Sequence, residues 1–243
     1  QLLIKLAAAG INPVEALIRT GTFPNPPALP YTPGFDGAGV VEKIGKNVKN
    51  FKVGDRVITA AAQGSGTYAE YVVTTPLFIA HLGSQLTFDE GAGIGIPYYT
   101  AYKLLCIIIR ARAGETLLVH GASGADVAPE GIDIILEMLA NVNLDKDLDL
   151  IKNRGRIGIV GSKDQAKIDT VKIMFKECLV TGVLIFLSTE AEWKEMHGAL
   201  EAGIKSGWLK PHIGLKFSLG QAAKAHDTIM NNSGTTGRII LQI

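Results

Sequence analysis

The sequence contains little cysteine, and this scarcity excludes one class of extracellular fold. Only Cys106 and Cys178 are present among 243 residues, and both stand in apolar surroundings, KLLCIII and FKECLV. A disulfide-stapled scaffold needs several cysteines at regular spacings, so that class is excluded. We expect both cysteines to be reduced core residues, which fits a reducing compartment and predicts a cytoplasmic protein.

Long apolar runs and an excess of charge of one sign are also absent from the sequence. The longest apolar candidate, 104–109, stops at Arg110, well short of the roughly 18 residues that a transmembrane helix needs. The N-terminal stretch carries Lys5 inside its apolar run, so we expect neither a signal peptide nor a membrane partner. The net charge of +1 gives no support for a nucleic-acid partner.

The histidine pattern predicts no metal centre. No CxxC occurs, and no paired ligand spacing is found among the five histidines, His81, His120, His197, His212 and His226. A lone histidine is more often structural or solvated than a ligand, so we expect no bound metal. The segment GASGA at 121–125 also departs from GxSxG, which argues against a serine hydrolase.

Residues 1–88 are rich in short strand-like segments punctuated by glycine. The runs LLIKLAAAGI, GAGVVEKIG, DRVITAAA and YAEYVVTT predict strands, and NPVEALIRTG predicts a short helix entered through Pro13. Such spacing is typical of a small, barrel-like β domain. Residues 1–88 are therefore expected to form the first part of a β-rich domain.

From Asp89 the sequence changes to alternating helices and strands. GAGIGIPYYTAYKLLCIIIRA has apolar residues at helical spacing and leads into the buried strand of LLVHGASG. IDIILEM, GRIGIVGS and VTGVLIFLS follow as strands, with a helix predicted at LDKDLDLIKN. This order predicts an α/β domain with a doubly wound parallel sheet over 89–188.

The tail, 189–243, is predicted to contain two helices and a last strand. We expect helices at AEWKEMHGALEAGIKSG and LGQAAKAHDTIMN, a loop around LKPHIG and a last strand at RIILQI.

Three predicted strands of the parallel sheet end in small or amide residues. LLVHGASG ends in a glycine turn, GRIGIVGS delivers Gly161 and Ser162, and Asn141 follows IDIILEM. Ligands bind at the carboxyl edge of such sheets, so these endings favour a ligand crevice. The glycine turn alone is a weak signal, because the full dinucleotide fingerprint is missing.

The segment after this turn is too short for the helix that should follow it. Only seven residues, 125–131, separate the turn from the next strand, and they include Pro129. A parallel crossover takes about a dozen residues or more, usually as a helix. Either the protein lacks this piece, or the sequence is part of a longer chain.

Taken together, nine segments resemble the zeta-crystallin type of quinone oxidoreductase, within the zinc-independent medium-chain dehydrogenases/reductases. The resemblance covers nearly the whole chain, in the order NPVEALIRTG, LPYTPGFDGAGVV, VGDRV, YAEYVV, GAGIGIPYYTAYKLL, AGETLLVHGASG, GIDIILEMLANVNL, GWLKPHIG and TTGRIIL. It implies a GroES-like β domain, split between N-terminal part and tail, and a Rossmann-type domain. It also implies NADPH as cofactor, a quinone or related conjugated carbonyl as substrate, and a homodimer or homotetramer.

The same resemblance assigns the site residues. Asn12 and Thr100 should approach the nicotinamide and position it, and Ser123 and Gly124 belong to the pyrophosphate turn. The other side of the cofactor should be lined by Asn141, Val160, Gly161, Ser162 and Lys163. Zinc-dependent relatives carry Gly-His-Glu where this chain has GFDG at 34–37, so the resemblance also implies no metal.

Two departures from the family bear on function. Leu17 stands where relatives usually have tyrosine, and Ala125-Asp126 replaces the Gly-Val that opens the next helix. Roughly fifty residues of the relatives have no counterpart after this point, more than one βαβ unit of about thirty. They include the residues that grip the adenosine ribose and 2′-phosphate, so the choice between NADPH and NADH is not set by the sequence.

These departures give two hypotheses. The first is an NADPH-dependent quinone reductase without zinc, whose missing piece is absent only from the sequence as given. The second is a non-catalytic relative, either a truncated isoform or a lens-type structural protein that has lost cofactor binding. We favour the first, because the strands and the tail that flank the gap keep normal patterns, and the abrupt start at Gln1 points the same way.

Overall fold

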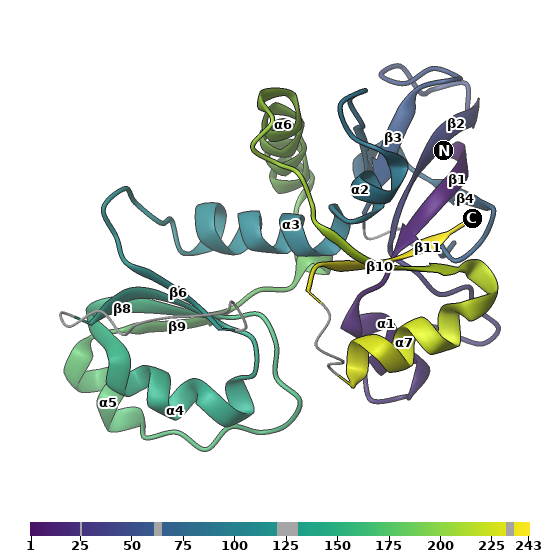
Figure 1. Ribbon diagram of the computed structural model, residues 1–243. Coiled ribbons are helices and arrows are strands. Elements are labelled where there is room, and N and C mark those ends of the chain that lie inside the picture. The colour runs from purple at the N-terminus through teal and green to yellow at the C-terminus, as the bar shows by residue number, and fades with distance from the viewer. Residues whose placement is uncertain (25, 61–64, 121–130, 232–235) are drawn as a thin grey trace. The chain divides into compact units, whose positions relative to one another are not determined.

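The chain folds into two compact units, each of which is described by itself. The computed structural model describes residues 1–24, 26–60, 65–120, 131–231 and 236–243 (Figure 1). The first unit comprises Gln1–Tyr99 and Ser188–Ile243, and the second comprises Thr100–Leu187. One unit is β-rich and the other contains a parallel α/β sheet, so the expected fold class is confirmed.

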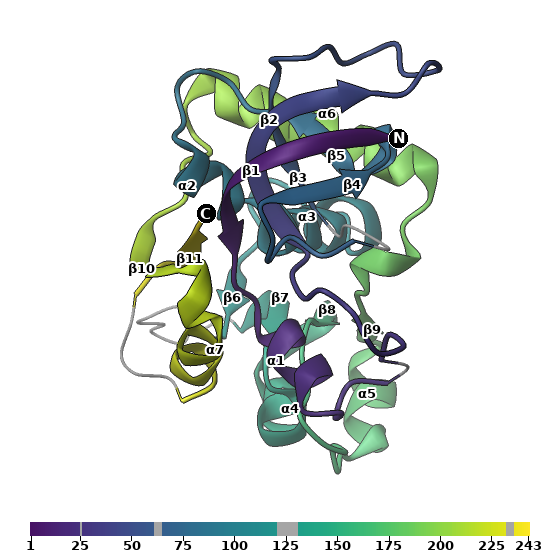
Figure 2. The same cartoon turned by 90° about the vertical axis from the view of Figure 1, so that its right-hand side faces the viewer.

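The first unit is built on a seven-stranded sheet around β1 (Leu2–Gly10). This strand pairs antiparallel with β2 (Asp36–Ile44) along its length, with β4 (Tyr71–Thr74) in its first half and with β11 (Arg238–Gln242) in its last residues. Two register shifts against β2 mark bulges, which bend a strand and increase its twist. Figure 2 shows β1 curving between β2 and β4.

Three further strands extend this sheet at its two ends. The order is β10 (Ile213–Ser218), β11, β1, β2, β3 (Arg56–Thr59) and β5 (Ile79–His81). β10 runs parallel to β11, and the other neighbours are antiparallel. The C-terminal tail therefore completes a sheet that the N-terminal part begins.

The core of the first unit follows from the alternation of apolar residues in β1. Leu2, Ile4 and Leu6 are buried, whereas Lys5 between them is exposed. They pack with Val41, Val57, Val72 and Ile79. Burial of each such side chain contributes roughly 1.5–3 kcal/mol, and a slip by one residue would expose the whole set, so the register is strongly determined.

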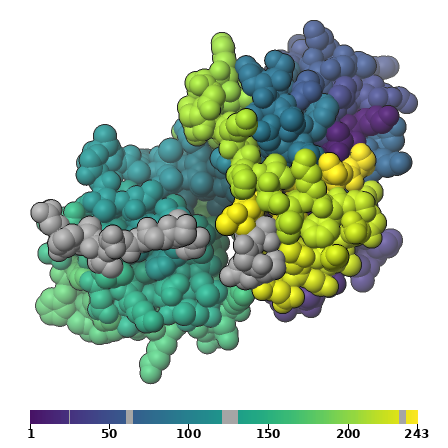
Figure 3. Space-filling model, in the orientation of Figure 1, coloured from purple at the N-terminus to yellow at the C-terminus, as the bar shows by residue number. Residues whose placement is uncertain are grey.

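Helices complete the first unit. They are α1 (Pro13–Arg19), α2 (Phe88–Ala92), α6 (Glu190–Ser206) and α7 (Ala222–Met230). Thr189 caps the N-terminus of α6, where its side chain accepts a hydrogen bond from the Glu192 backbone amide, and Gly207, with a φ of 85°, caps the C-terminus. α7 lies beside α1 (Figure 2), and its outer side chains form the yellow-green surface in Figure 3.

The second unit is a four-stranded parallel sheet covered on both faces. Its order is β6 (Leu117–Val119), β7 (Ile132–Glu137), β8 (Ile151–Ile159) and β9 (Leu179–Gly182). One face packs against α4 (Ala140–Leu150) and α5 (Thr170–Lys176). The other face packs against the π-helical segment Lys103–Ile108, which continues α3 (Gly95–Tyr102).

Several sequence-based predictions of local structure were wrong. VTGVLIFLS is a strand only as far as Gly182 and then forms a 3-10 turn at Ile185–Leu187. The helix expected over 144–153 begins at Ala140 and ends at Leu150. β10 and α5 were not predicted at all. Cys178 is buried as expected, but Cys106 is exposed.

Across the described ranges, no helix combines the length and the apolar character that a membrane span requires.

Candidate active site

Asn12 lies at the junction of β1 and α1 in the first unit. It is the N-cap of α1, its backbone is extended, and only 2% of its surface is exposed. Glu15, three residues on, reaches back with its carboxylate to the Asn12 amide N–H, at 2.5 Å. This capping box, followed by Pro13 at the first helical position, explains why the helix starts here.

The side-chain amide of Asn12 is held at both ends. Its Nδ2 donates to Asp36 Oδ2 at 2.9 Å and to Glu15 Oε1 at 3.2 Å. Its Oδ1 accepts a hydrogen bond from Arg238 Nη2 at 2.8 Å. Because acceptors face the nitrogen and a cation faces the oxygen, the orientation of the amide is fixed.

Asp36 links the Asn12 side chain to the start of α3. The Ile96 amide N–H donates to Asp36 Oδ1 at 2.8 Å, and Arg238 lies 3.7 Å from Oδ2. A Cβ atom at Gly95 would come within 2.0 Å of the Asp36 side chain, so glycine permits this close approach. A carboxylate is favourable at the first turn of a helix, because the N–H groups there have no intrahelical acceptor.

Burial keeps a proton within this cluster. Desolvation, reinforced by the charge of Asp36, raises the pKa of Glu15 to about 8. Desolvation raises the pKa of Asp36 to about 6, although the positive charge of Arg238 opposes the shift. Two buried carboxyl groups face one guanidinium, so at neutral pH Glu15 is protonated and Asp36 is ionised, which balances the charge.

Tyr68 and His226 continue the cluster from Glu15. The Tyr68 hydroxyl lies 3.3 Å from Glu15 Oε2 and 3.1 Å from His226 Nε2. Burial raises the pKa of Tyr68 above its ordinary value and lowers the pKa of His226. Both side chains are therefore neutral at pH 7, and the cluster carries no further buried charge.

In the second unit, residues at the ends of β7 and β8 contact one another. The side-chain oxygen of Asn141 accepts a hydrogen bond from the backbone N–H of Lys163 at 3.1 Å. The backbone N–H of Asn141 donates to Ser162 Oγ at 3.2 Å. The Ala140 amide donates to the Gly161 carbonyl. A Cβ at Gly161 would lie 2.7 Å from the Met138 carbonyl oxygen, so the two strand ends meet closely.

Four further residues were assigned by resemblance: Thr100, Val160, Ser123 and Gly124. Thr100 is half-buried in α3, in the second unit, whereas Asn12 belongs to the first. Val160 follows β8 directly and donates its amide proton to the Glu137 carbonyl. Ser123 and Gly124 lie outside the described residues. The roles of all these residues in cofactor binding stay predictions.

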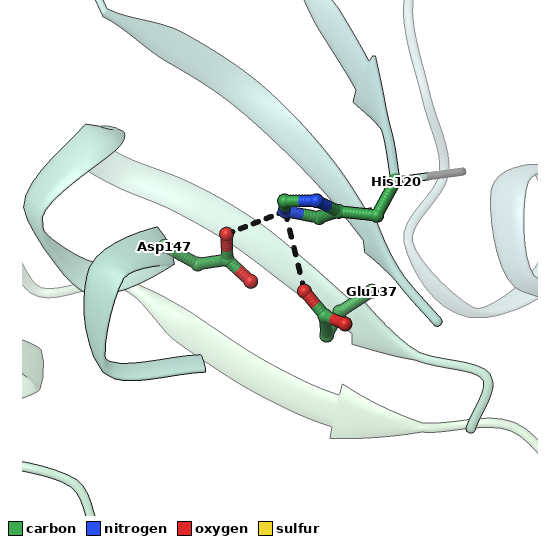
Figure 4. A group of neighbouring side chains, drawn as sticks. All are labelled: His120, Glu137 and Asp147. Carbon is green, nitrogen blue, oxygen red and sulfur yellow. Dashed lines mark hydrogen bonds and ion pairs between the residues drawn. The ribbon is translucent and has the colours of Figure 1, made fainter. Parts of the chain in front are cut away.

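A third cluster, which was not predicted, lies at the carboxyl ends of β6 and β7 (Figure 4). His120 Nε2 is 2.7 Å from Asp147 Oδ1 and 3.2 Å from Glu137 Oε2. Both carboxyl groups are buried, and desolvation and then the Glu137 carboxyl raise the pKa of Asp147 to about 7. His120 was interpreted from the sequence as an isolated histidine. Its partners, Glu137 and Asp147, lie 17 and 27 positions away along the chain, and only the fold brings them together.

The His120 cluster offers an imidazole nitrogen and carboxylate oxygens, which are common metal ligands. Its side chains, however, lie at hydrogen-bond distances from one another. One ligand atom from each of the three residues lies within 4.8 Å of the others. His120 Nε2 is in direct hydrogen-bond distance of Asp147, and the Glu137 side chain accepts from the Leu139 amide and from Asn143. In this arrangement the histidine binds Asp147 Oδ1, whereas the buried atoms Asp147 Oδ2 and Glu137 Oε2 have no hydrogen-bond partner among the described residues.

Comparison with known proteins gives consistent matches over both units. Residues 1–83 match the family described as the alcohol dehydrogenase GroES-like domain, and residues 113–241 match zinc-binding dehydrogenase. Human quinone oxidoreductase is 41% identical over 292 residues, covering 99% of this chain and 88% of that protein. The mouse protein of the same name is 39% identical, with the same coverage.

Solved structures show the same fold. Quinone oxidoreductase from Pseudomonas syringae pv. tomato has a TM-score of 0.86 at 22% identity, covering 100% of this chain and 91% of that one. A mycobacterial protein in complex with NADPH has a TM-score of 0.87 at 21% identity, with the same coverage. The β-rich unit, the parallel sheet and an identity of 41% over almost the whole chain lead to one conclusion. The chain belongs to the quinone oxidoreductase family of the medium-chain dehydrogenases/reductases.

Proposed function

We propose that this protein transfers a hydride from NADPH to a quinone or a related conjugated carbonyl, without zinc. The observation that carries the proposal is the 41% identity to human quinone oxidoreductase, which extends over both units. The mycobacterial structure that holds NADPH supports the choice of cofactor through its fold. A quinone that accepts a hydride and a proton becomes a hydroquinone.

The residues present fit one side of the cofactor. When bound, the nicotinamide supplies the hydride, and the protein supplies binding and orientation. Asn141, Ser162 and Lys163 meet at the carboxyl edge of the parallel sheet, where nucleotides bind in open α/β folds. We assign cofactor contacts to these residues, to Val160 and to Gly161.

Asn12 and Thr100 are proposed to position the nicotinamide. The Asn12 amide is preoriented by Asp36, Glu15 and Arg238, so it need not reorganise when a ligand binds. A quinone oxygen can take its proton from water, so the reaction requires no dedicated acid. The chain's contribution is therefore to bind the reactants and to hold them in line.

The proposal that zinc is not required rests on the donor set around Asp36. Asp36 stands where zinc-dependent relatives carry a Gly-His-Glu element. Its Oδ1 accepts from Ile96, and its Oδ2 accepts from Asn12 beside Arg238. Both oxygens are thus committed to hydrogen bonds, and the guanidinium disfavours a second cation there.

We also propose that the protein forms a homodimer or homotetramer. Val171, Met174 and Phe175 share one face of α5, and Phe175 is 77% exposed. Leu179 on β9 is 50% exposed, and β9 ends the sheet order of the second unit. Exposed apolar side chains at a sheet edge are typical of an interface with another subunit.

The alternative is a non-catalytic relative that has lost cofactor binding. The observation that favours it is the short connection between β6 and β7. These two strands are direct neighbours in the sheet, and they are joined by residues 120–131. A full dinucleotide site needs more structure before β7 than this connection can contain.

The experiment that separates the two functions is NADPH oxidation, followed at 340 nm with a panel of ortho-quinones, para-quinones and a conjugated enone. The proposal predicts quinone-dependent oxidation that a metal chelator does not inhibit. If a chelator abolishes the activity and added zinc restores it, the claim that zinc is not required is wrong, and the claim of quinone reductase activity stands. Absence of any quinone-dependent oxidation would favour the non-catalytic alternative.

A further inference from the structure

Glu15, Tyr68 and His226 form a hydrogen-bonded row inside the first unit, and the reaction proposed above makes no use of it. The Tyr68 hydroxyl lies between the other two side chains, 3.3 Å from Glu15 Oε2 and 3.1 Å from His226 Nε2. Glu15 and His226 are each only 2% exposed. They belong to α1 and α7, and Tyr68 precedes β4, so only the folded unit brings the three together. Titratable groups in contact can pass a proton from one to the next.

The hydrogen bonds of Glu15 leave one position for its proton. Oε1 accepts from the Phe35 backbone N–H at 3.0 Å and from Asn12 Nδ2 at 3.2 Å, which occupies both of its lone pairs. Oε2 accepts from the Asn12 backbone N–H and faces the Tyr68 hydroxyl. The proton of the neutral carboxyl group therefore lies on Oε2. In this state Glu15 donates to Tyr68, and Tyr68 donates to His226 Nε2.

His226 is the free end of the row. Its Nδ1 is buried and has no hydrogen-bond partner among the described residues. When Nε2 accepts from Tyr68, Nδ1 carries the ring proton. The next residue, Asp227, forms an exposed ion pair with Arg19, and the charges of both residues act on the His226 ring. A proton that reaches His226 is thus one residue from the exposed surface of α7, and Nδ1 is the atom that can release it.

The other end of the row meets the cluster around Asn12. Asp36 on β2 is hydrogen-bonded to Asn12, and Arg238 on β11 contacts both of them. With Glu15 neutral, the charges of Asp36 and Arg238 cancel, and with Glu15 ionised the cluster carries one negative charge. A nicotinamide ring that gives up a hydride gains one positive charge. An opposite charge nearby stabilises such a charge, so the ionised form of Glu15 suits the oxidised ring.

We infer that Glu15, Tyr68 and His226 form a proton relay, and that the site around Asn12 releases a proton through it when the nicotinamide is oxidised. The inference rests on the proposed reductase function, because that function places the nicotinamide at Asn12. In the relay, the Glu15 Oε2–H bond breaks as a Tyr68 O–H bond forms. Tyr68 passes its own proton to His226 Nε2, and His226 releases the proton of Nδ1. Glu15 ends ionised, Tyr68 and His226 end neutral, and one proton enters the solvent.

The test counts protons. The full chain is titrated calorimetrically with NADP⁺ and with NADPH, each in two buffers of different ionisation enthalpy at pH 7.5. The pKa of Glu15 is about 8 before binding, so the group is mostly protonated at this pH. If the oxidised ring lowers this pKa by about one unit, NADP⁺ should release about half a proton more than NADPH. The phosphate groups are the same in both ligands, so their titration cancels in the difference.

Two variants separate the group that loses the proton from the path that the proton takes. Glu15→Gln should abolish the difference between the two ligands, because an amide does not ionise. Tyr68→Phe keeps Glu15 but breaks the path. Proton release, followed with a pH indicator after rapid mixing with NADP⁺, should therefore be slowed at least about tenfold. The matched control is Tyr71→Phe, on an exposed tyrosine of β4, which should change neither readout.

Each outcome decides one claim. Equal proton release with NADP⁺ and NADPH in the wild-type chain would overturn the inference and leave the reductase function standing. A difference that persists in Glu15→Gln would mean that another group loses the proton. Release from Tyr68→Phe as fast as from the wild type would overturn the relay. The wild-type comparison and Tyr68→Phe decide the inference even if Glu15→Gln does not fold. If neither ligand binds, the proposed function itself is wrong.

Discussion

Asn12, Asp36 and Arg238 come from three elements that lie far apart in the sequence, and they meet inside the first unit. Asn12 was expected at the nicotinamide from the NPVE motif, but its partners were not. Arg238 lies 226 positions away, and a sequence without its fold gives no sign that the two touch. Glu15 was not predicted as a site residue, and its burial and its hydrogen bonds to Asn12 place it in this cluster.

The first residue-scale prediction concerns the charge of Arg238. Arg238→Met leaves the buried Asp36 carboxylate without its cation, and breaking a buried ion pair costs about 3–5 kcal/mol. Urea denaturation should show a loss in the free energy of unfolding of about 3 kcal/mol. The control is Arg19→Met, because the Arg19–Asp227 pair is exposed and its loss should change stability by less than about 1 kcal/mol. Equal effects of the two variants would contradict the account.

The second residue-scale prediction concerns pH. The pKa of Glu15 is about 8 in the folded protein against an ordinary value of 4.5, so the folded state binds more protons than the unfolded state between these values. Stability must then fall as pH rises from about 4.5 through 8. The shift corresponds to at most about 5 kcal/mol of this fall.

Glu15→Gln isolates the contribution of this carboxyl group. The variant should lose most of the decline in unfolding free energy between pH 6 and 9, because a neutral amide does not ionise. Glu42→Gln, an exposed position on β2, should keep the wild-type profile. A Glu15→Gln profile parallel to that of the wild type would show that Glu15 does not titrate in this window.

At the scale of elements, the strands with strong alternation or continuous apolar runs were predicted, and the elements defined by packing were not. β1, β2 and β7 follow directly from their residue patterns. β10 is only half-buried, begins just after Pro211 and contains Gly214, so its sequence was typical of a loop. α5 has no buried residue and forms by packing beside β8, which a local pattern cannot reveal.

The element-scale prediction concerns the contact between β8 and the segment Lys103–Ile108. A Cβ at Gly158 would lie 2.7 Å from a methyl carbon of Leu104 and 2.8 Å from one of Ile109. Gly158→Ala should therefore overpack this interface and lower the unfolding free energy by about 1–3 kcal/mol. Gly182→Ala in β9 is the control, because its Cβ would meet nothing closer than 3.9 Å. Thermal unfolding of the two variants checks the difference, and equal midpoints would contradict it.

At the scale of the whole molecule, the sequence indicates a β-rich part and an α/β part. Near residue 89, short strand-like segments give way to alternating helical and strand-like segments. The structure divides the chain within α3, after Tyr99, and again before Ser188. A boundary inside a helix has no signal in the sequence, since the helical pattern of this segment continues across it. Family resemblance supplied what local patterns could not, namely the return of the tail to the first sheet.

The whole-molecule prediction concerns assembly through α5 and β9. Light scattering should report a dimer or tetramer for the native chain. Phe175→Glu combined with Leu179→Lys places charges on two exposed apolar side chains and should shift the mass toward the monomer. Leu29→Glu, on an exposed residue of the first unit, is the matched control and should leave the mass unchanged. A monomeric native chain would contradict the proposal.

The most direct measurement of the central claim is hydride transfer itself. NADPH and NADPH deuterated at the transferred C4 position are each mixed with the protein and an excess of quinone, and the rate of nicotinamide oxidation is recorded. The account predicts one quinone reduced per NADPH consumed, and a slower rate with the deuterated donor when chemistry limits turnover. Oxidation at the same rate with and without the protein would contradict it.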